Sequence, residues 1–278
     1  MKYDLLAIDL DGTLLDTDHQ LPADNRAALH RAHDVGLKIV LCTGRSFTET
    51  RPIIDQIGLD LDATVTVFGA LVSDAATGRT LHRTPIPMDT AQAVTSWFQC
   101  DGYAVCWLTD PQEVGHDGYV LNGPNRHENI DRWLERTPCD VQNVTALPPD
   151  CAAPIRLSIV DEGPVLERIS PRLQSEFDGR LTHNVLHVPP YRLSLIESFD
   201  ASVNKWAGIE HLCRRWEIAP SHTVAVGDDV NDLAMIRDAA LGVAMGNANP
   251  LLTEIADRST ATNNECGVAQ LIDELLST

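Results

Sequence analysis

The sequence predicts an α/β protein: a doubly wound, Rossmann-like parallel sheet with an α+β domain inserted into it. Short apolar runs alternate with amphipathic helical segments near both ends of the 278-residue chain. This alternation is typical of a parallel sheet that helices cover on both faces. A middle stretch that is richer in tryptophan, proline and glycine breaks the rhythm, which indicates a second domain.

The first part of the chain reads as β-α-β-α-β. Each apolar run is short enough for a buried strand, and helix start and stop signals separate the runs. The expected elements are a strand at Leu5–Leu10, a helix at Asp24–Val35, a strand at Leu37–Cys42, a helix that begins near Ser46 in a capping box with Glu49, and a strand at Ala63–Phe68.

Proline-rich points delimit the middle stretch. Pro85 and Pro87 lie at its start and Pro189-Pro190 at its end, so residues 85–189 are expected to form the inserted domain and residues 1–84 and 190–278 the core. The α/β rhythm then returns. The expected core elements there are strands at Leu193–Glu197, Thr223–Val226 and Leu241–Ala244, and helices at Lys205–Trp216 and Asp232–Ala239.

The composition of the chain excludes some classes of binding partner. Hydrophobic residues make up 44% of the chain, enough for a sizeable core, and the formal net charge is −19. Such a surface repels nucleic acid and anionic lipid, and a phosphorylated substrate would need locally concentrated positive charge. Seven cysteines without C-x-x-C spacing favour reduced thiols, and no apolar run approaches membrane-spanning length. We therefore expect a soluble, cytoplasmic protein that binds neither nucleic acid nor membranes.

Polar residues follow several of the predicted strands, at the sheet edge where open α/β sheets bind ligands. Asp9 and Asp11 are two apart in an extended segment, so both side chains would face one side, and Gly12 permits a tight turn. A solvated Asp-Gly turn would explain Asp11 and Gly12 equally well. It explains Asp9 poorly, because Asp9 directly follows the apolar run.

Three weaker signals accompany this one. Thr43-Gly44-Arg45 offers a hydroxyl and backbone N–H groups for a phosphate oxygen, although an ordinary helix-entry turn has the same composition. Lys205 begins a predicted helix, where an isolated lysine is most often a solvated surface residue. The segment Gly227–Asp232 groups three acids and an amide after a buried strand. A helix N-terminus favours acids too, and an EF-hand is excluded because Leu233 would be its fifth position and no glycine its sixth.

The order of these motifs resembles the haloacid dehalogenase superfamily of phosphatases, and more narrowly its Cof-type subfamily with a large cap. The matching motifs are Asp9-Leu10-Asp11-Gly12-Thr13, Thr43-Gly44-Arg45, Gly227-Asp228-Asp229-Val230-Asn231-Asp232, Ala244-Met245-Gly246-Asn247-Ala248 and Cys266-Gly267-Val268. One departure is Phe68-Gly69-Ala70, where the family often has Asn-Gly-Ala. The inserted domain corresponds to the cap in size and position.

The resemblance implies a role for each matching residue. Asp9 would be the nucleophile and Asp11 the general acid/base, and Thr43, Gly44, Arg45 and Lys205 would contact the substrate, Thr43 and Lys205 at the phosphoryl oxygens. Asp9, the Asp11 backbone carbonyl and Asp228 would bind Mg²⁺, with Asn231 and Asp232 supporting the ion or its waters. Oxygen ligands suit this ion, and no His/Cys cluster offers a softer metal a better site.

The function that this resemblance implies is a magnesium-dependent phosphatase for a small phosphomonoester, such as a sugar phosphate, with an aspartyl-phosphate intermediate. The acid role of Asp11 requires its pKa to be raised. A phosphotransferase or phosphomutase with the same intermediate is the alternative. A phospho-receiver protein is a further alternative, although such domains are about half this length and place their acidic pair and acceptor aspartate on different strands. The oligomeric state is left open.

Overall fold

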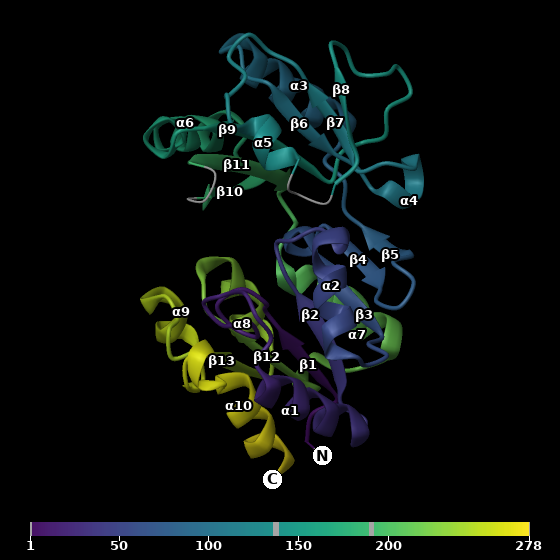
Figure 1. Ribbon diagram of the computed structural model, residues 1–278, viewed down its shortest axis with the longest axis vertical. Helices are drawn as coiled ribbons and strands as arrows, with labels where there is room; N and C mark the ends of the chain where they lie inside the picture. The colour runs from purple at the N-terminus through teal and green to yellow at the C-terminus, as the bar shows by residue number, and fades with distance from the viewer. Residues whose placement is uncertain (1, 136–138, 189–191, 278) are drawn as a thin grey trace. The chain divides into compact units, whose positions relative to one another are not determined.

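The computed structural model describes residues 2–135, 139–188 and 192–277. Two compact units make up the chain, and the chain passes from the first into the second and back (Figure 1). Unit 1 consists of Met1–His82 and Asn204–Thr278, and unit 2 of Arg83–Val203. The predicted α/β class, with a mostly parallel core sheet and a separate inserted sheet, is confirmed.

Unit 1 contains an eight-stranded sheet with the order β14-β13-β12-β1-β2-β3-β4-β5. The strands from β14 to β3 are parallel, and β4 pairs antiparallel with β3. Their bounds are β1 (Leu5–Ile8), β2 (Lys38–Cys42), β3 (Ala63–Thr66), β4 (Leu71–Asp74), β5 (Thr80–Arg83), β12 (Thr223–Gly227), β13 (Leu241–Ala244) and β14 (Arg258–Ser259).

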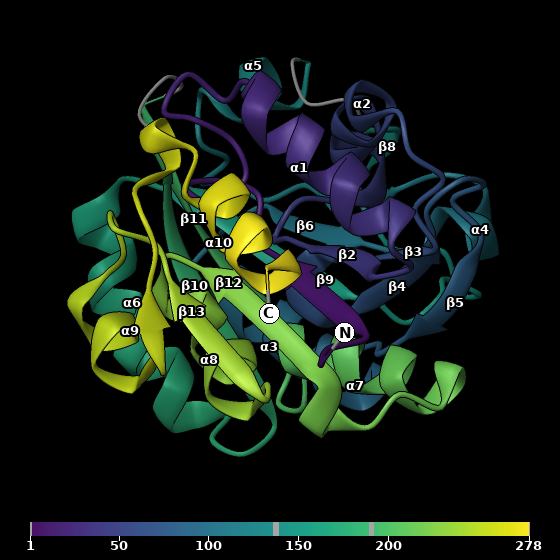
Figure 2. The same ribbon diagram turned by 90° about the horizontal axis from the view of Figure 1, so that it is seen from below.

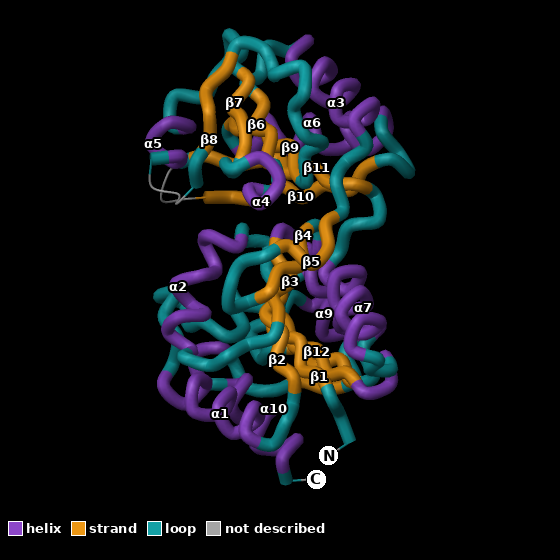
Figure 3. The backbone as a smooth tube through the Cα atoms, turned by 90° about the vertical axis from the view of Figure 1, so that its right-hand side faces the viewer, coloured by secondary structure: helices purple, strands orange, loops and turns teal. Residues whose placement is uncertain are grey.

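Helices cover both faces of this sheet because alternate strand residues point to opposite sides. Leu6 and Ile8 pack with α1, α2 and α10, whereas Leu5 and Ala7 pack with α7 and α8. Figures 2 and 3 show α1 and α10 on one side of the strands and α7 on the other. The helices are α1 (Ala23–Asp34), α2 (Phe47–Ile57), α7 (Lys205–Trp216), α8 (Leu233–Asp238), α9 (Pro250–Ile255) and α10 (Gly267–Leu276), with short 3₁₀ turns η1 (Val67–Gly69), η3 (Pro220–His222), η4 (Val230–Asp232) and η5 (Asn263–Glu265).

Local sequence signals set several of these bounds. The capping box at the start of α2 is confirmed, with Ser46 Oγ accepting from the Glu49 backbone N–H and the Glu49 carboxylate accepting from Ser46 N–H. The third strand was expected to reach Phe68 but ends at Thr66. There the backbone turns into η1, where Val67 and Phe68 adopt left-handed φ values of 51° and 56°.

Unit 2 contains a six-stranded sheet with the order β10-β11-β9-β6-β7-β8. Helices α3 and α6 pack on one face through Phe98 and Leu166, and α5 packs on the other through Ile130. The bounds are α3 (Met88–Cys100), β6 (Val105–Leu108), α4 (Pro111–Val114), β7 (Gly118–Leu121), α5 (Ile130–Leu134), β8 (Val141–Val144), β9 (Arg156–Asp161), α6 (Gly163–Glu176), β10 (Leu181–Val188) and β11 (Leu193–Asp200). Among the described residues of both units, no helix has the length and apolarity needed to cross a membrane.

The sheet to which one predicted strand belongs also differs from the sequence-based expectation. The strand expected at Leu193–Glu197 was placed in the core, but β11 pairs antiparallel with β9 and β10 and belongs to the sheet of unit 2. Its pairing satisfies a full row of backbone groups, so the second boundary falls at Val203 instead of residue 189. The linker expected at Pro189-Pro190 lies outside the described residues.

Candidate active site

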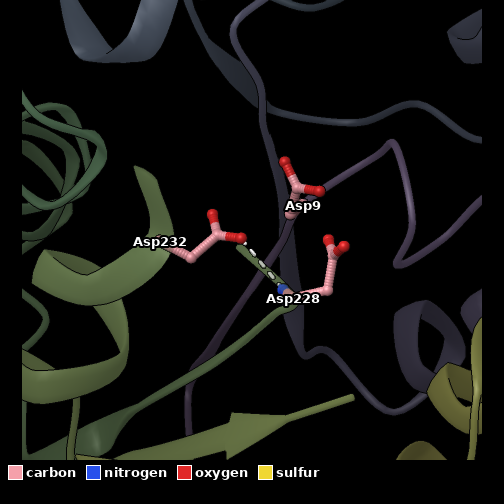
Figure 4. Close-up of side chains that lie close together, drawn as sticks. All are labelled: Asp9, Asp228 and Asp232. Atoms are coloured by element: carbon pink, nitrogen blue, oxygen red, sulfur yellow. Dashed lines mark hydrogen bonds between the residues drawn. The ribbon is translucent and has the colours of Figure 1, made fainter. Parts of the chain in front are cut away.

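The pairing of the central strands brings the first and last acidic motifs together. Ile8 on β1 lies opposite Val226 on β12 and Leu41 on β2. Asp9 therefore leaves the sheet beside Gly227, next to Asp228, and its backbone N–H donates to the Val226 carbonyl at 3.1 Å. The carboxylates of Asp9, Asp228 and Asp232 each place an oxygen within 4.8 Å of the others (Figure 4).

Lys205 is the cation of this cluster. It is the first residue of α7 and its side chain is only 1% exposed, so it is not the solvated lysine that the isolated residue suggests. Its Nζ donates to Asp9 Oδ1 at 2.5 Å, to Asp232 Oδ1 at 2.5 Å and to Asn231 Oδ1 at 2.9 Å. A buried ammonium with three acceptors is held in one position, which places its charge beside Asp9.

Asp232 braces the loop that carries Asp228. Its Oδ2 accepts from the backbone N–H groups of Asp228 at 3.0 Å and Asp229 at 3.2 Å, while its Oδ1 accepts from Lys205 (Figure 4 shows the first of these bonds). The side chain is fully buried. Both of its oxygens are thus occupied by protein donors, and Asn231 is likewise directed at Lys205.

The cluster carries more negative than positive charge. It contains three carboxylates and one ammonium, and two of the carboxylates have raised pKa values. Burial raises the pKa of Asp9 well above its usual range, with Asp232 and Asp228 adding to the rise against the pull of Lys205. Burial, together with Asp232, raises the pKa of Asp228 to about 6. A site of this charge is suited to a bound cation.

Asp9 and Asp228 fit the requirements of a divalent metal better than Asp232 does. Thr13 Oγ1 donates to Asp228 Oδ1 at 2.9 Å, and Lys205 occupies Asp9 Oδ1. Among the described residues, no hydrogen-bond donor contacts Oδ2 of Asp9 or Oδ2 of Asp228, so each offers an oxygen to an ion. Hard cations prefer such oxygen ligands.

The loop after β2 lies beside this cluster. Thr43 is buried, and its Oγ1 accepts from the Arg45 backbone N–H at 3.1 Å. A Cβ on Gly44 would lie 2.3 Å from Cζ of Phe68, so the Phe68 ring packs directly against this backbone. The residue that departs from the family pattern therefore packs an apolar ring against Gly44, where the family often has an amide.

Asp11 does not contact Lys205 and is bound by other residues. Its Oδ2 accepts from Arg45 Nε at 2.8 Å, and its Oδ1 accepts from Arg45 Nη2 at 2.5 Å and pairs with His19 Nδ1 at 3.0 Å. Burial works to raise the pKa of Asp11, but the hydrogen bonds and charge of Arg45, with His19, lower it overall. The acid role that the resemblance implies for Asp11 requires a raised pKa, and this arrangement does not supply one, because an arginine faces the carboxylate.

Two contacts of the site were not assigned from the sequence. Thr13 binds Asp228, as described above, and Asn247 Nδ2 donates to the Gly12 carbonyl at 2.8 Å. Both residues lie inside motifs that are recognisable in the sequence, so those motifs could have indicated them as site residues. His19 had no such signal, because no motif includes it.

Comparisons with known proteins identify the family of the chain. The family model for haloacid dehalogenase-like hydrolases matches residues 6–272. The chain belongs to this family. YxeH of Bacillus subtilis (strain 168) is 30% identical over 280 residues, covering 99% of this chain and 98% of YxeH. The 5-amino-6-(5-phospho-D-ribitylamino)uracil phosphatase YwtE of the same organism is 26% identical, covering 98% of each chain.

A solved structure of a haloacid dehalogenase-like hydrolase from B. subtilis superposes on this chain with a TM-score of 0.78, at 26% identity, covering 98% of this chain and 99% of the other. The haloacid dehalogenase, Cof-type resemblance is confirmed. As a haloacid dehalogenase-like hydrolase of this kind, the protein is a phosphatase for small phosphorylated metabolites.

Substitution of Gly12 tests whether the position of the Asp228 carboxylate matters for activity. Gly12 has φ +80°, and a Cβ there would lie 2.2 Å from Asp228 Oδ2. Gly36 has a similar φ of +87° with no atom within 4 Å of a Cβ. Because displacing a site carboxylate by about 1 Å costs on the order of a hundredfold in rate, Gly12→Ala is expected to lose about that much phosphatase activity.

Gly36→Ala serves as the matched control, because it shares the backbone strain without the collision. We expect it to lower the free energy of unfolding by about 1 kcal/mol and to leave phosphate release unchanged. Equal activity in the two variants would show that the contact between Gly12 and Asp228 does not matter for the reaction.

Proposed function

We propose that the protein is a magnesium-dependent phosphatase that hydrolyses a small phosphomonoester, such as a sugar phosphate, through an aspartyl phosphate at Asp9. The observation that carries the proposal is that Asp9 and Asp228 meet at the carboxyl ends of β1 and β12, with Lys205 Nζ 2.5 Å from Asp9 Oδ1. A nucleophilic carboxylate there lies beside an ammonium and a second carboxylate with an available oxygen.

Asp9 and Asp228 would hold Mg²⁺, together with the Asp11 backbone carbonyl that the family resemblance adds. When bound, the ion supplies the positive charge that an anionic phosphate needs beside two carboxylates. At about 4 Å and an effective dielectric constant of about 20, each pair of like charges costs about 4 kcal/mol, so Lys205 alone does not offset the repulsion.

The reaction would proceed in two steps. In the first, an Asp9 oxygen attacks phosphorus in line, the bond to the leaving oxygen breaks, and that oxygen keeps the electron pair and takes a proton from Asp11. For this proton transfer, the pKa of Asp11, which Arg45 lowers in the structure described here, must rise when the substrate binds. In the second, water attacks the acyl phosphate while Asp11 accepts a water proton, and Asp9 returns to a carboxylate. Thr43 and Lys205 would hold the phosphoryl oxygens, and Gly44 and Arg45 would border the phosphate.

One relative supports a phosphorylated sugar or sugar alcohol as the substrate, because YwtE is a 5-amino-6-(5-phospho-D-ribitylamino)uracil phosphatase. Unit 2 is a complete domain inserted into the core, and it would serve as a cap that contacts the non-phosphate part of the substrate. We infer that the chain divides in this way into a catalytic and a specificity domain.

A panel of phosphorylated metabolites tests the proposal. We expect free phosphate and the dephosphorylated product to appear in equal amounts, with sugar phosphates and sugar-alcohol phosphates among the best substrates. A phosphomutase would instead yield an isomeric phosphate ester and little free phosphate. The absence of phosphate release from every phosphomonoester would contradict the proposal.

Removing the metal is expected to stop the reaction. Treatment with EDTA should reduce phosphate release to the background rate, and added Mg²⁺ should restore it, because Asp9 and Asp228 would otherwise repel the substrate. EDTA that has been saturated with Mg²⁺ beforehand is the control and should have no effect. Full activity in excess chelator would refute the metal assignment.

A further inference from the structure

We propose that His19 is a positioning residue that, together with Arg45, holds the Asp11 carboxylate as the base for hydrolysis of the aspartyl phosphate. The inference rests on the proposed function, in which Asp11 serves as the acid and base of the reaction. It adds a residue that belongs to none of the recognised motifs.

The contacts of Asp11 suit a carboxylate. Arg45 contributes two N–H donors and His19 Nδ1 a third, at 2.5–3.0 Å. A carboxylate is an acceptor only, so all three nitrogens act as donors to it. Arg45 binds both oxygens of the carboxylate, and His19 adds an independent contact to Oδ1. Together they restrict the rotation of a side chain that is 40% exposed.

Hydrogen bonds of the local backbone hold His19 in its position beside Asp11. This residue has a left-handed φ of +57°, which costs energy for a side chain with a Cβ and persists only where the surroundings enforce it. Asp16 does so. Its Oδ1 accepts from the N–H groups of Asp18 and Gln20 at 2.9 Å, its carbonyl accepts from His19 N–H at 3.0 Å, and its N–H donates to the Gln20 carbonyl at 3.0 Å.

The same loop is also tied to the rest of unit 1. Thr17 donates through its N–H and its hydroxyl to Asn264 Oδ1, at 3.1 and 3.2 Å. The His19 side chain itself is 70% exposed, so burial does not explain its strained backbone. Its bond to Asp11 is the contact that this turn secures.

The step that depends on this arrangement is the second one. The water oxygen attacks phosphorus, Asp11 takes one water proton, the bond between phosphorus and the Asp9 oxygen breaks, and its electron pair stays on Asp9. Without His19, Arg45 is the one described side chain that still holds the Asp11 carboxylate. We therefore expect hydrolysis of the aspartyl phosphate to slow. The first step is spared when the leaving group is p-nitrophenolate, which departs without a proton.

The test is pre-steady-state kinetics of His19→Ala with p-nitrophenyl phosphate and Mg²⁺. We expect a burst of about one p-nitrophenolate per enzyme, because the phosphoenzyme accumulates. The steady rate that follows should be about tenfold below wild type, a part of the full contribution of a general base. KM should fall with kcat, so that kcat/KM stays unchanged. His19→Gln, whose amide also donates, should recover most of the steady rate.

His222→Ala is the matched control. His222 makes the same kind of exposed bond, from Nδ1 to Asp4 Oδ2 at 2.7 Å, but next to the amino end of β1. The His222→Ala variant should behave as wild type.

The inference is overturned if His19→Ala keeps the wild-type kcat, or if kcat and kcat/KM fall together without a burst. Failure of the proposed function is distinguishable, because wild-type enzyme would then release no phosphate at all.

Discussion

Replacing Asp9 by asparagine is expected to lower kcat by about 10⁴-fold or more, because an amide oxygen does not form the acyl phosphate. The fold should survive, since asparagine has the same shape and its oxygen still accepts from Lys205, which lies 2.5 Å from Asp9 Oδ1. Two measurements check this: phosphate release, and capture of a phosphoprotein by acid quench, which wild type should show and the variant should lack.

Asp4→Asn provides the control for the same chemical change. Asp4 stands just before β1, at the end of the strand opposite Asp9, and its side chain is exposed. Its activity should match wild type, and both variants should unfold at the same denaturant concentration as wild type. Retained magnesium-dependent turnover in Asp9→Asn would remove Asp9 from the nucleophile role.

The fold was predictable wherever local signals coincide with a buried face. The bounds of α7 and β13 agree with the sequence-based expectation, because their apolar spacing starts and stops at clear capping or turn residues. The strand β11 shows the limit. The segment was correctly predicted to be a strand, but a strand-like sequence carries no information about which sheet supplies the partner. The pairing with β9 and β10 depends on residues distant in sequence.

The approach of Asp9 to Asp228 followed from a general rule, since both residues end neighbouring parallel strands. The partners of Asp11 did not follow. Alternation in an extended segment predicts the side that Asp11 faces, but it does not predict that Arg45 and His19 bind its carboxylate. That outcome depends on loop conformations that no periodic pattern describes.

Replacing Lys205 by methionine is expected to have the largest effect on stability. Methionine fills a similar volume but leaves Asp9 and Asp232 buried without their shared cation. Breaking a buried pair by removing one partner costs about 3–5 kcal/mol, because the remaining charge stays desolvated. Urea unfolding in EDTA measures this loss directly, and activity should fall with it, since the ammonium beside Asp9 is also lost.

Lys38→Met separates this effect from a general cost of losing a lysine. Lys38 pairs with Asp62 at 3.0 Å, but the two side chains are 33% and 45% exposed. Water screens such a pair, so its loss should cost no more than about 1 kcal/mol. In the Lys205→Met background, Asp232→Asn removes one of the stranded charges and should recover part of the stability, whereas in wild type the same change should only destabilise. Similar small losses for Lys205→Met and Lys38→Met would mean that the acidic cluster tolerates its charge without Lys205, and the electrostatic account of the site would have to be abandoned.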